Sequence, residues 1–299
     1  MGAVAQAIEA NFPGTPEAND AWMILGDVAL HAGDLKGAAE HFGHIPADAP
    51  VRPEADLKQG QATWQRYLVA SKLPEEERLP PAELDALATE ARTLLERGRA
   101  TMRKSVESGG ELTFSLLASE LYLAQLHNGV GQYDQAVAIL ELPSTGPLAL
   151  VEAKNPLAER GNFAAEVWKA ALRANVGLQK LEAAEKAMTA LEQRFAGSLE
   201  GEAALTRLYV TLGLELEEQV ARLQAQGKKE ELARVLDGFK LFLDRILSRQ
   251  QGLTYNALNW VAETYFRMGQ GLGVGADGAP TPQALAYFQQ GTVAFQKLL

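Results

Sequence analysis

Histidines and glycines are the residues whose types and spacing could do chemistry in this chain. His41 and His44 lie three residues apart, as two zinc ligands on one face of a helix would. No third ligand lies near them in the sequence, and His44 falls at the expected end of a helix. The chain contains no cysteine, which excludes disulfides, thiolate metal sites and cysteine nucleophiles. We therefore expect two solvent-facing histidines, with no metal and no cofactor.

A second candidate is the run of alternating glycines from Gly269 to Gly275, which looks like a phosphate-binding loop. Such a loop has to follow a strand and open a helix, or end in Gly-Lys-Ser/Thr. This run follows a predicted helix, contains no lysine and leads into Gly278-Ala279-Pro280. We interpret residues 269–282 as a flexible insert between two helices. Serine and threonine residues lack a base at motif spacing, so we do not expect an enzyme.

Composition narrows the class of partner. The 299 residues include 38 Asp and Glu against 28 Lys and Arg, a formal net charge of -10 at pH 7. Because an acidic chain repels phosphate backbones, nucleic acid is not expected as a partner. No stretch approaches the roughly 20 continuous apolar residues of a membrane-spanning helix. The compartment stays open between the cytoplasm and the bacterial periplasm or cell envelope, since a chain without cysteine suits either redox environment.

The elements that would position any site are helices. Apolar residues recur at intervals of three and four, and alternating β-branched runs are missing. We predict an all-α chain with helices over residues 3–11, 17–32, 35–44, 52–71, 82–107, 111–129, 133–142, 161–178, 181–195, 200–226, 229–249, 254–268 and 282–298. No shift of composition divides the chain, so residues 1–299 are predicted to form a single domain. Both ends resemble cut helical pairs, so we expect a piece of a larger protein.

The clearest motif consists of large and small residues at fixed offsets: Trp22, Leu25, Gly26, Ala29, Gly33, Ala38 and Phe42. This pattern resembles the tetratricopeptide repeat (TPR), with Ala29 in place of the usual tyrosine. The spacing has a physical reason, because a small residue in the first helix lets the second helix approach closely. Ala38 and Phe42 then pack back from that second helix.

Similar offsets recur along the chain. Gly60 follows Gly26 by 34 residues (60 − 26), which matches the period of the family. The resemblance implies an α-solenoid of about six stacked antiparallel helical hairpins. Later units are longer, since Trp168 and Leu216 lie 48 residues apart (216 − 168), so the array is expected to be irregular. Residues 7–18 are also similar to the link between repeats in bacterial cell-envelope assembly proteins of this superfamily.

In such an array the first helices of the pairs line a concave face. Residues of these helices that do not point into the core are therefore candidates for binding a partner. For Trp64 and Trp260, packing between neighbouring hairpins is an equal alternative, because aromatic residues serve both roles. The full set of candidates is Gln61, Trp64, Gln65, Tyr122, Gln125, Asn128, Lys169, Arg173, Asn256, Asn259, Trp260, Glu263 and Arg267.

Lys169 and Arg173 form the basic pair among these candidates. They lie four residues apart on one predicted helix, so both side chains project to one face. We hypothesise that they attract an acidic segment of a partner, because a guanidinium grips a carboxylate with two hydrogen bonds and lysine adds a point charge. The alternative is that both pair with local acids such as Glu166.

The resemblance implies a function in protein–protein binding. We predict a scaffold or assembly subunit that binds another protein or a peptide segment through its concave face. A regulatory or targeting segment of a larger enzyme, whose catalytic domain is absent from this chain, is the alternative. A purely structural spacer without a specific partner is the third possibility.

Overall fold

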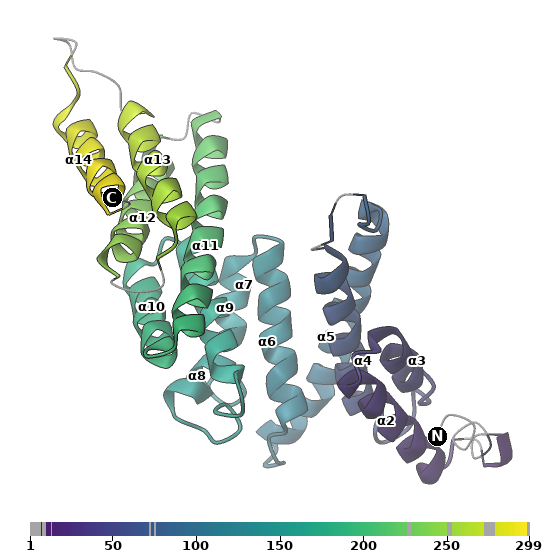
Figure 1. Cartoon of the computed structure of the whole chain (residues 1–299). Coiled ribbons are helices and arrows are strands. Elements are labelled where there is room, and N and C mark those ends of the chain that lie inside the picture. Colours follow the sequence, from purple (N-terminus) through teal and green to yellow (C-terminus); the bar gives the residue numbers. More distant parts are fainter. Residues whose placement is uncertain are drawn as a thin grey trace. The chain divides into compact units, whose positions relative to one another are not determined.

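The computed structural model describes residues 7, 10–12, 14–71, 73–74, 76–225, 229–249, 253–271 and 279–297. This part of the chain is all-helical, with 13 helices and no β-strand (Figure 1). The helices are α2 (Pro16–His31), α3 (Leu35–Gly43), α4 (Arg52–Ser71), α5 (Pro81–Glu107), α6 (Phe114–Gly129), α7 (Tyr133–Leu140), α8 (Pro147–Glu152), α9 (Phe163–Gly177), α10 (Leu181–Phe195), α11 (Leu199–Ala225), α12 (Lys229–Ser248), α13 (Tyr255–Gly271) and α14 (Pro282–Gln296).

Most of these helices were predicted from the periodicity of the sequence. From α2 onward, every predicted helix end lies within three residues of the observed end. The predicted helix over residues 3–11 lies mostly outside the described residues. The short helix α8 was missed because six residues carry little periodic signal. Its cue was Pro147 at the first helical position, followed by Leu148 and Val151, which are buried.

The glycine run near residue 270 differs from the prediction. Helix α13 continues through Gly269 to Gly271, so the expected insert does not begin at Gly269. An added Cβ at Gly269 would lie 2.6 Å from a ring carbon of Phe288 on α14. This glycine therefore allows close helix packing and does not serve a loop. The remainder of the predicted insert, residues 272–278, lies outside the described residues.

Several helices begin at a side chain that caps their free amides. The first four N–H groups of a helix have no partner within the helix, so a short polar side chain before it is stabilising. Six residues directly before a helix accept a hydrogen bond from the amide three residues further on: Thr15, Asp34, Thr113, Ser198, Thr254 and Thr281. These local signals explain why the starts of α2, α3 and α14 could be predicted to within one residue, whereas α6 begins three residues later than predicted, after its cap Thr113.

The chain divides into two compact units, residues 1–174 and 175–299, and each is described by itself. In the first unit α2 packs on α3, α3 on α4, and α4 on both α5 and α6. Helix α6 also packs on α5, α7 and α8. In the second unit α11 packs on α10, α12 and α13, while α13 also packs on α12 and α14. Most consecutive helices therefore contact one another within each unit. The sequence analysis placed no boundary inside the chain.

The α2–α3 pair packs as the repeat-like motif predicts. Gly26 of α2 lies directly under the Phe42 ring of α3, where an added Cβ would lie 2.3 Å from the nearest ring carbon. Phe42 and Ala38 are fully buried. Both belong to a core cluster that also contains Ala29 of α2 and Ala62 of α4. The small residue of the motif thus allows the close approach of the two helices.

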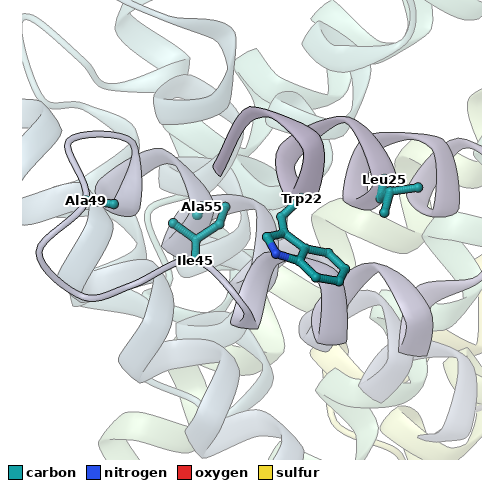
Figure 2. Packing of buried hydrophobic residues seen from close by; sticks show 5 residues of the cluster. All are labelled: Trp22, Leu25, Ile45, Ala49 and Ala55. Atoms are coloured by element: carbon teal, nitrogen blue, oxygen red, sulfur yellow. The ribbon is translucent and has the colours of Figure 1, made fainter. Parts of the chain in front are cut away.

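Trp22 anchors a second cluster between the same helices. It is buried against Leu25, Ile45, Ala49 and Ala55, as Figure 2 shows. This arrangement joins the start of α4 to the α2–α3 pair. Burial of the indole removes a large apolar surface from water at this point.

The two closely spaced histidines also contact Trp22. The His44 ring stacks on the indole with centroids 4.2 Å apart, and the His41 ring with centroids 5.7 Å apart. His44 is exposed, but His41 is half-buried. The prediction of two solvent-facing histidines is therefore wrong for His41, because its position on α3 places it against the tryptophan.

A buried carboxylate joins α4 to α5. Asp56 is 2% exposed and receives hydrogen bonds from two arginines. Arg52 Nε donates to Asp56 Oδ1 at 2.6 Å, and Arg97 of α5 donates from Nε and Nη2 to the two carboxylate oxygens at 2.6 Å each. Arg52 also donates to the Ile45 carbonyl oxygen at 2.7 Å, beyond the C-terminal end of α3. One ionic cluster thus holds three helices.

A second buried carboxylate joins α5 to α6. Glu120 has no exposed surface, and its Oε2 lies 2.7 Å from Arg99 Nε. Arg103 lies further away at 3.8 Å, and the Thr145 hydroxyl donates to Oε1 at 3.3 Å. Burial raises the pKa of the Glu120 carboxyl, although the charges of Arg99 and Arg103 oppose that effect. Helix α5 therefore directs arginines to acids on both of its neighbours.

Replacing Gly26 with alanine should destabilise the chain by about 1–3 kcal/mol, because the added methyl group overlaps the Phe42 ring. The cost of this overlap is expected to outweigh the gain of about 1 kcal/mol in helix propensity that alanine brings to a helix interior. Gly129 is a matched control at the end of α6, since nothing lies within 4 Å of its added Cβ. Chemical denaturation should show G129A unchanged or more stable. Equal effects of the two substitutions would contradict the close packing.

Replacing Glu120 with glutamine should alter the dependence of stability on pH. The folded chain holds the Glu120 proton more tightly than the unfolded chain does, because burial raises the pKa. This group therefore contributes stability below its unfolded pKa and loses it as the pH rises through its folded pKa. The free energy of unfolding of the wild type minus that of E120Q should fall as the pH rises above the ordinary glutamate pKa of about 4.3. A rise of this difference, measured by urea denaturation, would show the opposite shift.

Candidate functional site

A first candidate surface lies on α4, α6 and α9 of the first unit. Burial raises the pKa of the Tyr122 hydroxyl of α6, and the Gln65 side chain of α4 lies close enough to oppose that effect. One residue earlier on α4, Trp64 Nε1 donates to Gln125 Oε1 at 3.5 Å. Gln61, Gln65, Tyr122 and Gln125 are half-buried, so part of each side chain reaches the surface. The structure thus brings together predicted residues that lie about sixty positions apart in the sequence.

Helix α9 extends this surface. Burial raises the pKa of the Tyr122 hydroxyl, and the negative charge of Glu166 on α9 raises it further. Lys169 Nζ donates to Glu166 Oε1 at 2.8 Å, and its side chain keeps 29% exposure. We call the surface formed by Gln61, Gln65, Tyr122, Gln125, Glu166 and Lys169 the α4–α6–α9 face.

Two predicted members are core residues instead. Trp64 is 3% exposed, and its ring stacks on Tyr67 with centroids 4.8 Å apart. Asn128 is 2% exposed and donates from Nδ2 to the Ala170 carbonyl oxygen at 2.9 Å, which links α6 to α9. Neither side chain presents a surface to a partner. For Trp64 the alternative of packing between helices therefore applies.

The basic pair on α9 is engaged within the chain. Lys169 is paired with Glu166, as the alternative interpretation expects, and Arg173 is half-buried. The hypothesis of an acidic partner segment assumed an outward pair without local acids. Because Glu166 neutralises Lys169, the charge available to such a segment is smaller than the sequence suggests.

The predicted residues of the second unit lie along α13. Asn256 is exposed, and Asn259 donates from Nδ2 to Glu263 Oε1 at 2.9 Å. Arg267 donates to Glu217 Oε1 of α11 at 2.6 Å. Trp260 is half-buried, and its ring packs on Gly213 of α11, where an added Cβ would lie 2.1 Å away. Trp260 therefore serves in part to join α13 to α11.

A hollow of about 390 Å³ lies beside these residues. Its walls are Glu263, Phe266 and Arg267 of α13 and Phe295 of α14. Sequence reasoning identified the two charged walls but missed the two phenylalanines. The sequence signal that could have identified Phe266 and Phe295 is that both helices of this predicted pair carry phenylalanine. We call this feature the α13–α14 hollow.

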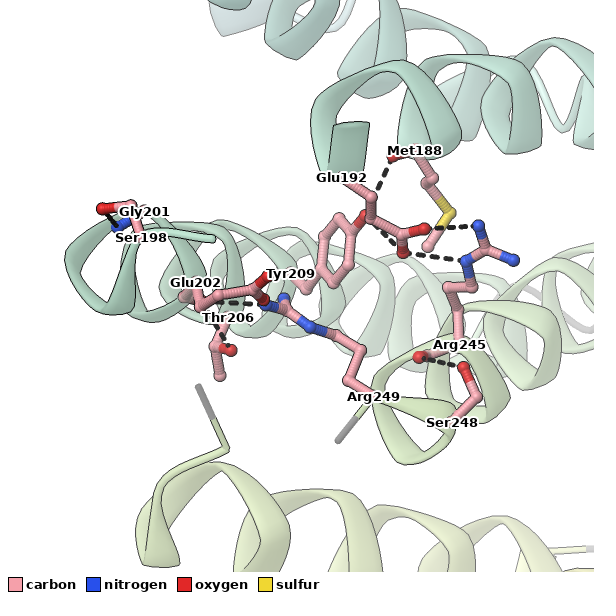
Figure 3. Close-up of polar contacts among 10 residues, drawn as sticks. All are labelled: Met188, Glu192, Ser198, Gly201, Glu202, Thr206, Tyr209, Arg245, Ser248 and Arg249. Atoms are coloured by element: carbon pink, nitrogen blue, oxygen red, sulfur yellow. Dashed lines mark hydrogen bonds and ion pairs between the residues drawn. The ribbon is translucent and has the colours of Figure 1, made fainter. Parts of the chain in front are cut away.

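A polar cluster that the sequence did not reveal joins α10, α11 and α12. Figure 3 shows Glu192 facing Arg245 and Glu202 facing Arg249. Arg245 donates to both carboxylate oxygens of Glu192, from Nε at 2.8 Å and from Nη2 at 2.5 Å. Arg249 donates to the Glu202 carboxylate and, at 3.0 Å, to the Glu202 carbonyl oxygen.

Tyr209 lies at the centre of this cluster. Its hydroxyl donates to Glu192 Oε1 at 3.3 Å, and the Arg249 guanidinium lies over its ring at 5.6 Å from the centroid. Burial raises the pKa of the Tyr209 hydroxyl, and the Glu192 charge raises it further. A cleft of about 540 Å³ borders the cluster, but its two arginines are already paired with the two acids that line it. The cluster is therefore a helix-joining network.

In the described part of the chain, no group of three or more His, Asp or Glu side chains could hold a metal ion. Among the described helices, none combines the length and the apolar character needed to cross a membrane. Comparison of this chain with protein-family models, with curated proteins and with solved structures finds no match.

Replacing Arg249 with methionine should destabilise the second unit by roughly 2–4 kcal/mol, because it leaves Glu202 without its cation in a site where the two side chains are 6% and 18% exposed. The double variant R249M/E202Q should recover part of this loss. Lys36 is a matched control, since its pair with Glu40 is 73% and 61% exposed and its replacement by methionine should cost under about 1 kcal/mol. Thermal and urea denaturation measure the stability of the Arg249 variant and of the Lys36 control. Equal losses would contradict a buried pair.

Proposed function

We propose that this chain is a TPR-like, irregular α-solenoid that binds another protein, as a scaffold or an assembly subunit. The packing of Gly26 under Phe42 supports the repeat-like character of the first helix pair. The recurrence of close glycine contacts in other pairs, such as Gly60 with Leu95 and Gly269 with Phe288, supports the extension to later pairs.

The single observation that carries the proposal is the α4–α6–α9 face. Its residues come from the first helices of three predicted pairs and lie together through two side-chain contacts, Gln65 with Tyr122 and Trp64 with Gln125. Glutamine and tyrosine side chains both donate and accept hydrogen bonds, so they suit a polar protein surface or a peptide backbone. Trp64 supports this face from beneath, because it is buried between α4 and α6.

The test is capture of a partner by the tagged full chain and by two matched variants. The first variant truncates the face with Q61A, Q65A and K169A. The second truncates three exposed residues of the second helices with E90A, E96A and Q135A. A specific partner, identified by mass spectrometry and then purified, should bind the face variant at least about tenfold more weakly, while the control binds as the wild type does.

Circular dichroism and thermal denaturation should show that both variants stay folded. Equal affinity of the partner for the face variant and the wild type would remove the α4–α6–α9 face from the binding site. Failure of the full chain to retain any specific partner would favour a structural spacer.

A further inference from the structure

The α13–α14 hollow combines an aromatic floor with an unbalanced charge. Phe266 and Phe295 have ring centroids 5.8 Å apart, and Phe266 also contacts Phe288 at 5.5 Å. The Phe266 ring packs on Gly291, where an added Cβ would lie 2.8 Å away. The floor is thus held in place by the packing of both helices, although Phe295 remains 38% exposed.

The charged rim is not neutral. Arg267 is paired with Glu217, which also accepts from the Thr264 hydroxyl at 2.7 Å. Glu263 accepts only from the neutral amide of Asn259 and has no cationic partner in the described part of the chain. One carboxylate therefore remains uncompensated at the edge of the aromatic floor.

We propose that the α13–α14 hollow binds an amphipathic segment of a partner protein that packs a leucine or aromatic side chain on Phe266 and Phe295 and places a lysine or arginine beside Glu263. The volume of about 390 Å³ suits one or two large apolar side chains. The rim selects a basic flank, because an acidic one would meet Glu263 at close range. The formal net charge of -10 favours the approach of basic segments.

This inference goes beyond the proposed binding face, since it concerns residues of the other unit and a partner of stated chemistry. The probe is a fluorescein-labelled helical peptide of about 14 residues, four turns, with leucine and phenylalanine on one face and lysines beside them. A second peptide has each lysine replaced by glutamate. Fluorescence anisotropy measures binding of both peptides to the full chain.

The lysine peptide should bind the wild type in a saturable manner and more tightly than the glutamate peptide does. E263K should weaken the lysine peptide about fivefold and strengthen the glutamate peptide. F295A should weaken the lysine peptide about tenfold, because part of the floor is lost. E182K is the matched control, an exposed acid of α10 outside the lining of the hollow, and should change binding less than about twofold.

Three outcomes would overturn the proposal. One is the absence of saturable binding of the lysine peptide to the wild type, and another is equal affinity of the two peptides. The third is binding that E182K weakens as much as E263K does, since that would indicate general charge attraction. Because Phe295 is partly exposed, F295A should fold, and thermal denaturation checks this. The Q61A/Q65A/K169A variant leaves the α13–α14 hollow unchanged, so it should bind the lysine peptide as the wild type does. Failure of this proposal can therefore be told apart from failure of the proposed α4–α6–α9 face.

Discussion

Close approach of helices at glycine is the contact on which the packing depends. At Gly26, Gly213 and Gly269 an aromatic ring of the next or a nearby helix lies where a side chain would otherwise be. The α13–α14 pair has this contact in both directions, because the Phe266 ring of α13 also packs on Gly291 of α14. A ring packed on bare backbone brings two helices together and buries a large apolar surface in one step. Larger residues at these positions would hold the helices apart.

Charge is distributed so that acids meet arginines where helices meet. Asp56 and Glu120 are buried, and arginines of α5 reach both of them. In the second unit Glu192 and Glu202 meet arginines at the end of α12. Such pairs contribute little net stability when formed, but removing one partner is costly because a buried charge remains. The pairs therefore favour one arrangement of neighbouring helices over others.

The two proposed binding surfaces consist of side chains that the helix packing leaves partly exposed. On α4, α6 and α9 the remaining side chains are amides, a phenol and one lysine already paired with an acid. On α13 and α14 they are two phenylalanines with an uncompensated carboxylate at the rim. The first surface suits hydrogen bonding, and the second suits an apolar anchor with a basic neighbour. The chemistry of the two proposed surfaces therefore differs.

The sequence by itself determined the helices and the first helix pair. Helical periodicity, capping residues such as Thr15 and Asp34, and turn glycines act over a few neighbouring residues, so the linear order contains them. The same holds for Trp22, Gly26 and Phe42, whose offsets reflect two adjacent helices. The short helix α8 and the continuation of α13 to Gly271 were missed because a few residues carry weak periodic signal.

Only the tertiary structure decided which polar residues turn inward and which acids find arginines. Trp64 and Asn128 occupy positions that the helical period alone leaves open to the surface, yet neighbouring helices cover them. Arg245 meets Glu192 and Arg249 meets Glu202 across separations of 53 and 47 residues. No local pattern encodes such pairs, because they depend on how whole helices stack. The α13–α14 hollow arises for the same reason, since its walls come from two helices whose packing brings Phe266 and Phe295 together.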